Sequence, residues 1–488
     1  MNRKLDRAGN EWTFELLREA DELIHDIAAN TYKLDTFPNQ IEVISAEQML
    51  DAYSSGAMPV MYPHWSYGKS YSVNEHLYQT GQQNLAYEVV INSNPCISYL
   101  MEENTMTMQA LVIAHACYGH NSFFKGNYLF RQWTQADAII DYLVFAKKYV
   151  MECEEKYGFE AVKEVLDAAH ALQYFGVDRY KRRFESEASV RARRDELVEE
   201  KRRQYDEIMA RVSPKEAASI EREKDKYPPE PVENLLYFIE KEAPKLQDWE
   251  RELVRIVRKM AQYFYPQGQT KVMNEGWASF WHYTLLNTLY DTDQVTDGFM
   301  LEFLTSHTNV VFQPDSRDGK YRALNPYALG FAMFSDIRRM CENPTQEDRE
   351  WFPDIAGAGD WLKVLDFAMR NFKDESFIRQ FLSPRIIRDF RLFAIADHKD
   401  QSDLYIDSIH NDEGYRRIRS LLADQYSREN MVPDIQVSAY ARMTDRSLTL
   451  TYTNRRGRPL EAAESEKTLA FVERLWGFPV ILECEDAH

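Results

Sequence analysis

The chain has 488 residues, 44% of them hydrophobic and 13% aromatic, which is enough to bury a large core and too many for a disordered protein. Its 78 acidic and 59 basic residues give a net charge of −19, which disfavours nucleic acid as a partner because proteins that bind it concentrate Lys and Arg on one face. The first residues lack the apolar region of a signal peptide, no apolar run approaches the roughly 18 residues of a membrane span, and the five cysteines include no CxxC pair. We therefore expect a cytoplasmic protein with reduced cysteines and no membrane span.

Amphipathic helices dominate the expected structure up to residue 390. Apolar residues recur with a helical period in, for example, segments 12–27 and 253–264. Glycine is scarce, and neither a GxGxxG nor a GxxxxGK[ST] phosphate-binding loop is present. We predict a mainly α-helical body over residues 1–390 without a nucleotide-binding domain of either kind.

Two histidines lie at the end of the helix expected within 104–121. His115 follows Leu111 by four residues on the apolar face, so its imidazole is expected to point into the core. Gly119 is expected to end the helix, and His120 comes directly after it. Residues five apart on an unbroken α-helix diverge by about 140°, so the two imidazoles converge only if the chain turns or unwinds at Gly119.

Residues 178–226 differ from the rest of the body. They contain fifteen Lys or Arg and thirteen Asp or Glu, with few large apolar side chains. Intermixed charge at this density is typical of a solvated helix or arm. We expect an exposed, charged insertion in the helical body.

A second helix, expected over 272–290, also carries polar residues on its apolar face. Glu275 and His282 lie on the same stripe, two turns or about 10 Å apart along the axis. A carboxylate on a core-facing stripe is unfavourable unless it is paired, hydrogen-bonded or bound to a metal ion. Glu275 therefore needs a partner.

The two helices together offer four nitrogen and oxygen ligands that suit Zn²⁺, Fe²⁺ or Mn²⁺. We expect His115, His120 and Glu275 to bind a divalent ion, with His282 as a fourth ligand or a neighbouring acid or base. A buried Glu–His pair can instead be purely structural, and that alternative stays open for each residue taken singly.

From residue 391 onward the hydrophobic period changes, which predicts a separate α+β domain over 391–488. The strands are expected at 391–397, 404–410, 435–443, 448–453 and 479–484, and the helices at 414–426 and 464–476. Nothing in this domain identifies a ligand.

Several long segments allow a comparison with a known family. They are HACYGHNSFFKGNYLF, QYFYPQGQTKVMNEGWASFWHY, SHTNVVFQP, NPYALGFAMF, YPHWSYGKSY and AYEVVINSNPCISYLMEEN. Together they closely resemble the stage V sporulation protein R (SpoVR) family, and the resemblance spans nearly the whole chain. It weakens around 184–220, and Lys125-Gly126-Asn127 stands where the family pattern has Lys-Asn-Asn.

The resemblance implies a bacterial protein of sporulation or the stress response. The family is linked to spore cortex assembly in sporulating bacteria. In other bacteria it is linked to a stress system that contains a PrkA-type serine kinase and a von Willebrand-like protein, which are the partners it implies here. It implies no reaction, because the biochemical activity of the family is not established.

A shorter resemblance bears on the chemistry. The segment NEGWA at 274–278 is similar to the NEGxA segment that gives gluzincin metallopeptidases their third zinc ligand, and it implies a zincin-like helical core. In those enzymes a helical HExxH supplies the other two ligands and the general base. Here the histidines have the spacing HxxxxH, and Ala116 stands where the base is expected.

A general base must then come from elsewhere. Glu88 lies in an apolar run, and Glu103 lies at the start of the His115 helix, where a carboxylate is also explained by the helix dipole. These two residues and His282 are the candidate catalytic groups. His64 and His307 lie in polar and aromatic segments that are typical of cleft walls.

Two functions follow. The first is a metal-dependent hydrolase acting on an amide or ester, as in a peptide or a cell-wall precursor. The second is a non-catalytic regulatory or scaffold protein of the kinase-linked stress system. The inward His/Glu cluster favours the enzyme, whereas the missing HExxH glutamate favours the scaffold.

Overall fold

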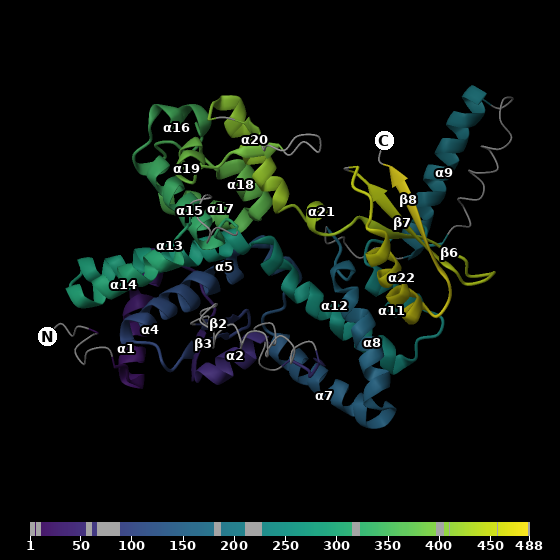
Figure 1. Ribbon diagram of the computed structural model, residues 1–488, viewed down its shortest axis with the longest axis horizontal. Helices are drawn as coiled ribbons and strands as arrows, with labels where there is room; N and C mark the ends of the chain where they lie inside the picture. The colour runs from purple at the N-terminus through teal and green to yellow at the C-terminus, as the bar shows by residue number, and fades with distance from the viewer. Residues whose placement is uncertain are drawn as a thin grey trace. The chain divides into compact units, whose positions relative to one another are not determined.

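The chain folds mainly into helices, with three small sheets (Figure 1). This confirms the expectation of a mainly α-helical chain with a small C-terminal part that contains strands. None of the described helices is long and apolar enough to cross a membrane. The computed structural model describes residues 5, 11–54, 61–65, 88–179, 187–209, 227–314, 323–396, 405–408, 410–455 and 457–486.

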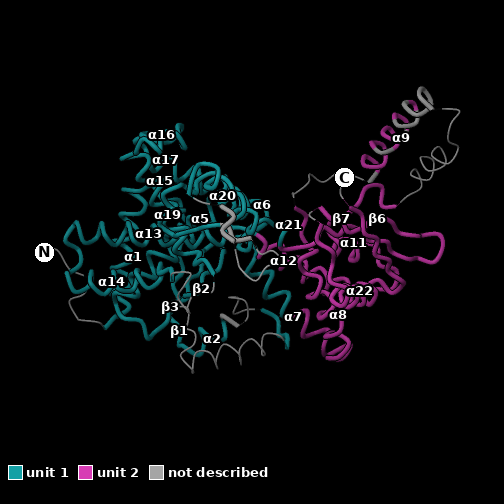
Figure 2. The backbone as a smooth tube through the Cα atoms, turned by 45° about the horizontal axis from the view of Figure 1, so that its top comes forward, with its two compact units in different colours: residues 1–147, 266–430 teal, residues 148–265, 431–488 magenta. Residues whose placement is uncertain are grey.

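Two compact units divide the chain, and each is assembled from two separate stretches (Figure 2). Unit 1 comprises residues 1–147 and 266–430, and unit 2 comprises residues 148–265 and 431–488. Two long helices continue from one unit into the other: α7 (Ile139–Tyr157) begins in unit 1, and α12 (Asp248–Gln269) ends in it.

Unit 1 contains a large helical core and two of the sheets. Its first stretch has α1 (Phe14–Asp26), the π-helix η1 (Ile27–Thr31), β1 (Asn39–Ile44), α2 (Ala46–Ser54), β2 (Glu88–Ile91), β3 (Cys96–Met101), α4 (Met106–Val112), the π-helix η2 (Ile113–His120), α5 (Asn121–Gly126) and α6 (Tyr128–Trp133). Its second stretch has α13 (Lys271–Asp291), α14 (Asp297–Val310), α15 (Pro326–Glu342), α16 (Gln346–Trp351), α17 (Trp361–Asn371), α18 (Asp374–Phe381), α19 (Pro384–Asp389), β4 (Ala394–Ala396), β5 (Tyr405–Ser408), α20 (Asp412–Gln425) and α21 (Arg428–Met431), which ends one residue past the boundary.

Unit 2 packs helices against a three-stranded sheet. Its elements are α8 (Phe159–Ala171), the 3₁₀ turn η3 (Gln173–Phe175), α9 (Glu187–Met209), α11 (Leu235–Glu242), β6 (Ile435–Tyr440), β7 (Leu448–Asn454), α22 (Ala462–Trp476) and β8 (Val480–Asp486). The strand order is β6-β7-β8, with β6 antiparallel and β8 parallel to β7. The strands and helices expected beyond residue 434 are therefore present.

The boundary between the units falls at 430/431, whereas the sequence suggested one near 390. The elements between these points, β4, β5 and α20, belong to unit 1. Tyr415, Ile418 and Leu422 of α20 are buried in the same core as Phe377 of α18, so the apolar face of α20 is already covered within unit 1. A change of period marks a change of element type, but it does not show which core an amphipathic helix joins.

The charged segment 178–226 is described only in part, because residues 180–186 and 210–226 lie outside the described residues. Its described centre is the helix α9, and Leu197 is exposed there although it is apolar. Arg193 of α9 forms an ion pair with Glu230 at 2.6 Å.

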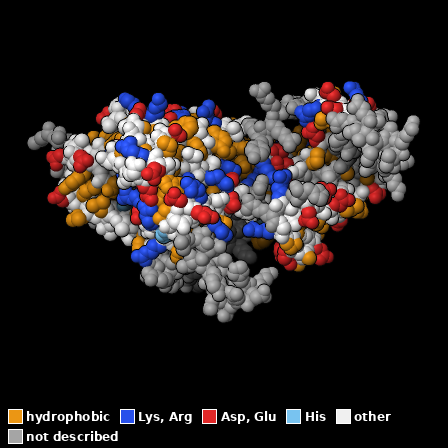
Figure 3. Space-filling view, turned by 90° about the horizontal axis from the view of Figure 1, so that it is seen from above, with side chains coloured by type: hydrophobic (Ala, Val, Ile, Leu, Met, Phe, Trp, Pro, Cys, Tyr) orange, Lys and Arg blue, Asp and Glu red, His pale blue; other side chains and the backbone are white. Residues whose placement is uncertain are grey.

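On the face of the molecule shown in Figure 3, acidic and basic side chains both appear, with hydrophobic ones between them.

Two close backbone contacts in unit 1 involve α13 and depend on glycine. A Cβ atom at Gly119 of η2 would lie 2.6 Å from Cα of Ala278, and one at Gly276 would lie 2.3 Å from Cα of Gly330 of α15. Gly119 therefore does not end its helix, as its sequence position suggested. It lies inside a continuous helical run and lets η2 approach α13 directly, whereas Gly276 and Gly330 let α15 approach α13.

Substituting Gly276 with alanine tests this packing. The added methyl group has no room against Gly330, so we expect Gly276→Ala to destabilise the protein by about 1–3 kcal/mol. Gly268 of α12 is the matched control, because nothing lies within 4 Å of its Cβ position and Ala favours a helix by up to about 1 kcal/mol. Thermal unfolding of the two variants measures the difference, and equal midpoints would contradict the close crossing.

Candidate metal and catalytic site

A cleft of about 740 Å³ opens in unit 1 between β2, the helical run from α4 to α5, α13 and the start of α15. Its walls combine apolar and polar side chains. They are Glu88, Val89, Val90, Leu111, Val112, His115, His120, Phe124, Gln267, Lys271, Asn274, Glu275, His282, Val310, Asn325, Pro326 and Tyr327. Most of the polar side chains come from α13 and from η2.

The π-helix η2 brings the two histidines together. Thr105 caps the preceding helix by accepting a hydrogen bond from the Met108 amide, and the run continues without a break through η2 into α5. In a π-helix the hydrogen bonds join residues five apart, so such residues lie one above the other. His115 and His120 consequently share a face, and their ring centroids are 4.7 Å apart. The expected convergence occurs, but through π-helical winding rather than unwinding at Gly119.

Helix α13 presents Glu275 to this pair, and its first turn is held from another helix. The carboxylate of Asp374, at the start of α18, accepts hydrogen bonds from the amides of Val272 and Met273, both at 2.8 Å. These bonds satisfy two of the amides that have no partner within the helix itself. The position of Glu275 is thereby fixed one turn from a capped end.

Glu88 joins the cluster from β2, the edge strand of the sheet β1-β3-β2. His115 Nε2 lies 3.2 Å from Glu88 Oε1 and 3.9 Å from Glu275 Oε2. His120 Nε2 lies 3.8 Å from Glu88 Oε1 and 3.5 Å from Glu275 Oε2. Two ligands of a tetrahedral ion with bonds of about 2.0–2.1 Å are themselves about 3.3 Å apart. The four nitrogen–oxygen distances are close to this value, and Glu88, His115 and His120 offer ligand atoms that all lie within 4.8 Å of one another.

The ring of His120 is oriented by the residue next to Glu275. His120 Nδ1 donates to Oδ1 of Asn274 at 2.9 Å, since an amide oxygen can only accept. In the neutral ring the lone pair is then on Nε2, the atom that faces both carboxylates. A lone pair opposite two carboxylates is repulsive unless a cation or a proton lies between them.

The pKa shifts of Glu88 and His115 also show that burial disfavours charge in the cluster. Burial, and after it the Glu275 carboxylate, raises the pKa of the Glu88 carboxyl well above its usual range. Burial, and after it the neighbouring imidazoles, lowers the pKa of His115 well below its usual value. Oε2 of Glu88 and Oε2 of Glu275 are buried without a hydrogen-bond partner among the described residues. A buried carboxylate oxygen in this state is unfavourable, so the cluster favours a cation.

His282 lies behind His115 rather than beside the carboxylates. Its Nδ1 is 2.8 Å from His115 Nδ1, and its Nε2 is 2.7 Å from His307 Nδ1 on α14. Both ring nitrogens are therefore occupied, and His282 offers no ligand atom in this arrangement. Of the two roles expected for His282, this arrangement matches a neighbour of the cluster that contacts the ligand candidate His115 better than a fourth ligand.

Glu103, the second candidate base, lies outside the cleft. Its side chain is exposed, and Oε1 accepts a hydrogen bond from the amide of Ala46 at the start of α2, at 3.3 Å. His64, suggested as a cleft wall, makes a tilted ring contact with Trp65 and does not line the cleft. The structure thus brings together His115, His120, Glu275 and Glu88 and leaves Glu103 out.

The sequence predicted some of the residues around this cluster but not their contacts. His307 follows Phe299 and Phe303 at intervals of four, which places it on the buried face of α14, but the sequence does not show that it meets His282. Asn274 has no separate sequence signal beyond its place before Glu275. Glu88 was noticed as a buried carboxylate, but its partners lie on elements far away in the chain.

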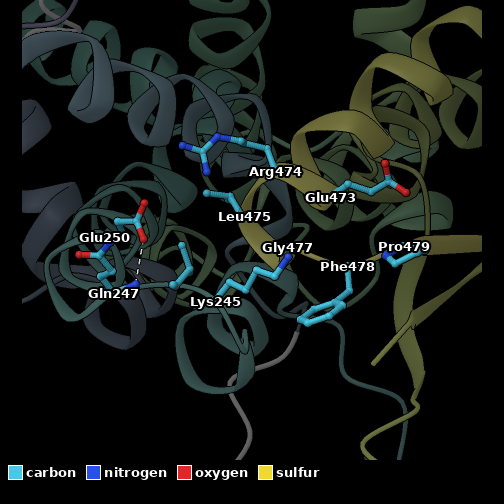
Figure 4. A pocket seen from close by; sticks show the side chains of 10 residues that line it. Lys245, Gln247, Glu250, Glu473, Arg474, Leu475, Gly477, Phe478 and Pro479 are labelled. Carbon is cyan, nitrogen blue, oxygen red and sulfur yellow. Dashed lines mark hydrogen bonds between the residues drawn. The ribbon is translucent and has the colours of Figure 1, made fainter. Parts of the chain in front are cut away.

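A second cavity, of about 560 Å³, lies in unit 2 (Figure 4). Its carboxylates are engaged locally: Glu250 accepts from the Gln247 amide, and Glu473 accepts from the Val480 amide. Lys245 lies over the ring of Phe478, with Nζ 4.5 Å from the ring centroid. No histidine is among the described residues that line this cavity, and the contacts of its polar groups are those of packing and capping.

The fold and the cluster define a helical protein with two imidazoles and two carboxylates on one cleft wall. The SpoVR-like family model matches residues 11–431 and the SpoVR-like C-terminal domain model matches residues 433–487, so the chain belongs to the SpoVR family. It is 58% identical over 478 residues to the "Uncharacterized protein YcgB" of Escherichia coli (strain K12), covering 97% of this chain and 93% of that one. No solved structure is significantly similar.

The buried histidines predict acid sensitivity. Burial lowers the pKa of His307 from 6.5 to about 4, so the folded state resists protonation that the unfolded state accepts. Its contribution is complete above pH 6.5 and is lost as the pH falls towards 4, by about 3 kcal/mol in all. Glu88 has the opposite sign, because its raised pKa favours the folded state at low pH.

Thermal unfolding between pH 7 and 4.5, with a chelator present, tests this prediction. The wild-type midpoint should fall more steeply than that of His307→Asn, which cannot titrate at this position. Parallel curves for the two proteins would contradict the assignment.

Proposed function

We propose that the cluster binds one divalent metal ion, with Zn²⁺ the first candidate, and that the protein hydrolyses an amide or ester bond. The observation that carries the proposal is the set of four N···O distances between His115, His120, Glu88 and Glu275, which lie between 3.2 and 3.9 Å. Imidazole and carboxylate donors at this spacing suit Zn²⁺, Mn²⁺ or Fe²⁺.

The proposed roles follow from the open position that a catalytic site requires. Catalytic zinc sites have three protein ligands and leave one position for water or substrate. We assign His115, His120 and Glu275 as ligands, since Glu275 lies on the capped helix α13. Glu88 is then the general base, because a carboxyl with a raised pKa is better matched to proton transfer near neutral pH.

The chemistry is the attack of water on a carbonyl carbon. A divalent ion in the cluster supplies a Lewis acid that activates water and polarises the carbonyl. Glu88 takes the proton from the attacking water and returns it to the leaving nitrogen or oxygen as that bond breaks. The apolar side chains of the cleft, such as Val90, Leu111 and Phe124, hold the substrate and exclude bulk water.

The competing function is a regulatory or scaffold role without catalysis. Ala116, at the place of the HExxH glutamate, favours it. The proximity of Glu88 to both imidazoles weakens this argument, because a carboxylate from another element can serve as the base.

Metal analysis of protein purified without added metal or chelator tests the ligand assignment. We expect about one divalent ion per chain in the wild type. Glu275→Ala and His120→Asn should lose it, because each removes a proposed ligand atom. Glu103→Gln is the matched control, since Glu103 is an exposed carboxylate outside the cleft, and it should retain the ion. A metal-free wild type would refute the proposal.

Hydrolysis tests the role of Glu88. With a defined mixture of peptides and esters, analysed by mass spectrometry, Glu88→Gln should retain the metal and lower turnover by about 100-fold or more. Loss of metal in Glu88→Gln would instead make Glu88 a ligand. Stoichiometric metal without hydrolysis of any substrate would favour the scaffold role.

A further inference from the structure

Three imidazoles form a continuous hydrogen-bonded line that begins at the cluster. His115 contacts His282 at 2.8 Å, and His282 contacts His307 at 2.7 Å. All three side chains are buried, His282 completely. The line connects the cleft wall on η2 through α13 to α14.

A nitrogen–nitrogen hydrogen bond holds a single proton, and a neutral imidazole has one N–H donor and one acceptor. The direction of one bond therefore fixes the direction of the next. In the array that we call inward, His307 Nδ1 donates to His282 Nε2, and His282 Nδ1 donates to His115 Nδ1. In the array that we call outward, both donors and acceptors are exchanged.

The two arrays differ at the cluster. In the inward array the proton of His115 is on Nε2, 3.2 Å from Glu88 Oε1, where the negative charge of an ionised carboxylate attracts it. In the outward array the proton is on Nδ1, and the Nε2 lone pair faces the carboxylates. A metal ion needs that lone pair, so only the outward array is compatible with a bound cation.

His120 does not take part in this choice. Its Nδ1 proton is held by Asn274 Oδ1 at 2.9 Å, which leaves Nε2 ready to bind a cation in either array. Of the two imidazoles that face the carboxylates, His115 is the one in contact with another histidine, and it also has a backbone hydrogen bond with Ala278.

We propose that binding of a cation at the cluster reverses the hydrogen bonds along His115, His282 and His307, so that His307 Nε2 changes from an acceptor to a donor. The proposal rests on the proposed metal site. The protons balance: one leaves His115 Nε2 for water in the cleft, one crosses each of the two N···N bonds, and one is taken up at His307 Nε2 from a water molecule or polar group that contacts this nitrogen. Every ring is neutral before and after the reversal.

The reversal changes the hydrogen-bonding character of His307, the histidine farthest from the cluster. His307 packs against the rings of Tyr283 and Phe331, each with a centroid 4.8 Å away, and Tyr283 is 36% exposed. No hydrogen bond to His307 Nε2 is found among the described residues. A water or polar group that approaches this nitrogen must donate to it in the metal-free protein and accept from it in the metal-bound protein. Metal occupancy in the cleft is thereby coupled to the hydrogen-bonding character of α14.

Tautomers measured in the full-length protein test the proposal directly. With histidine labelled by ¹⁵N, two-bond ¹H–¹⁵N correlations distinguish Nδ1–H from Nε2–H for each ring, and single His variants assign the 11 histidines. In chelator-treated protein we expect His282 and His307 to carry the proton on Nδ1. After addition of Zn²⁺ both should carry it on Nε2, whereas His120 should keep Nδ1–H throughout.

The outcomes separate this proposal from the metal site itself. Zn²⁺ binding with unchanged tautomers of His282 and His307 overturns the reversal and leaves the metal site intact. An outward array already present in the chelated protein also overturns it. Failure of Zn²⁺ to bind overturns both proposals.

A pair of variants gives a second readout. Asn places an amide oxygen near the position of the imidazole Nδ1, so His307→Asn keeps the acceptor that the outward array needs. His307→Leu fills the apolar surroundings better but removes the acceptor. Removing a hydrogen-bond partner behind a ligand typically weakens metal binding by about 10–100-fold, so we expect His307→Leu to bind Zn²⁺ more weakly than His307→Asn. A purely packing role predicts the reverse order, and that order would overturn the proposal.

Discussion

The direct backbone contact between η2 and α13 at Gly119 is the constraint on which the site depends. A side chain there would collide with Ala278 and hold the two helices apart. Because the helices touch, His115 and His120 on one reach Glu275 and His282 on the other. A second contact, between Gly276 and Gly330, holds α15 on the opposite side of α13, and α15 contributes Tyr327 to the cleft. The chemistry of the cluster is thus a consequence of helix packing that only glycine permits.

The same packing brings buried carboxylate oxygens together with too few hydrogen-bond donors. Each carboxylate of the cluster has a buried oxygen without a hydrogen-bond partner among the described residues, and His120 faces them with a lone pair. A shared proton would relieve part of this repulsion, in agreement with the raised pKa of Glu88. A divalent cation would relieve all of it, because it accepts both lone pairs of the imidazoles and neutralises the carboxylates together. The chain thus retains a costly arrangement that a bound cation would make favourable.

Periodicity in the sequence predicted those parts of the structure that depend on a single helix or strand. His115 and Glu275 lie on apolar stripes, so their inward orientation followed from spacing alone, and the strands and helices of the tail followed in the same way. Features that depend on contacts between distant segments could not be predicted from periodicity. The π-helical winding of η2, the arrival of Glu88 from an edge strand and the capture of His282 by two other histidines are all set by tertiary packing. For the same reason Gly119 looked like a helix terminator, and α20 looked like part of the C-terminal domain.

Whether His115, His120 and carboxylate oxygens bind one cation can be read from the coordination shell of the ion. X-ray absorption at the zinc edge of the full-length protein, loaded with stoichiometric Zn²⁺, reports the ligand types and their distances. We expect two imidazole nitrogens and carboxylate or water oxygens, all at about 2.0–2.2 Å. A shell without imidazole, or one with sulfur at about 2.3 Å, would contradict it.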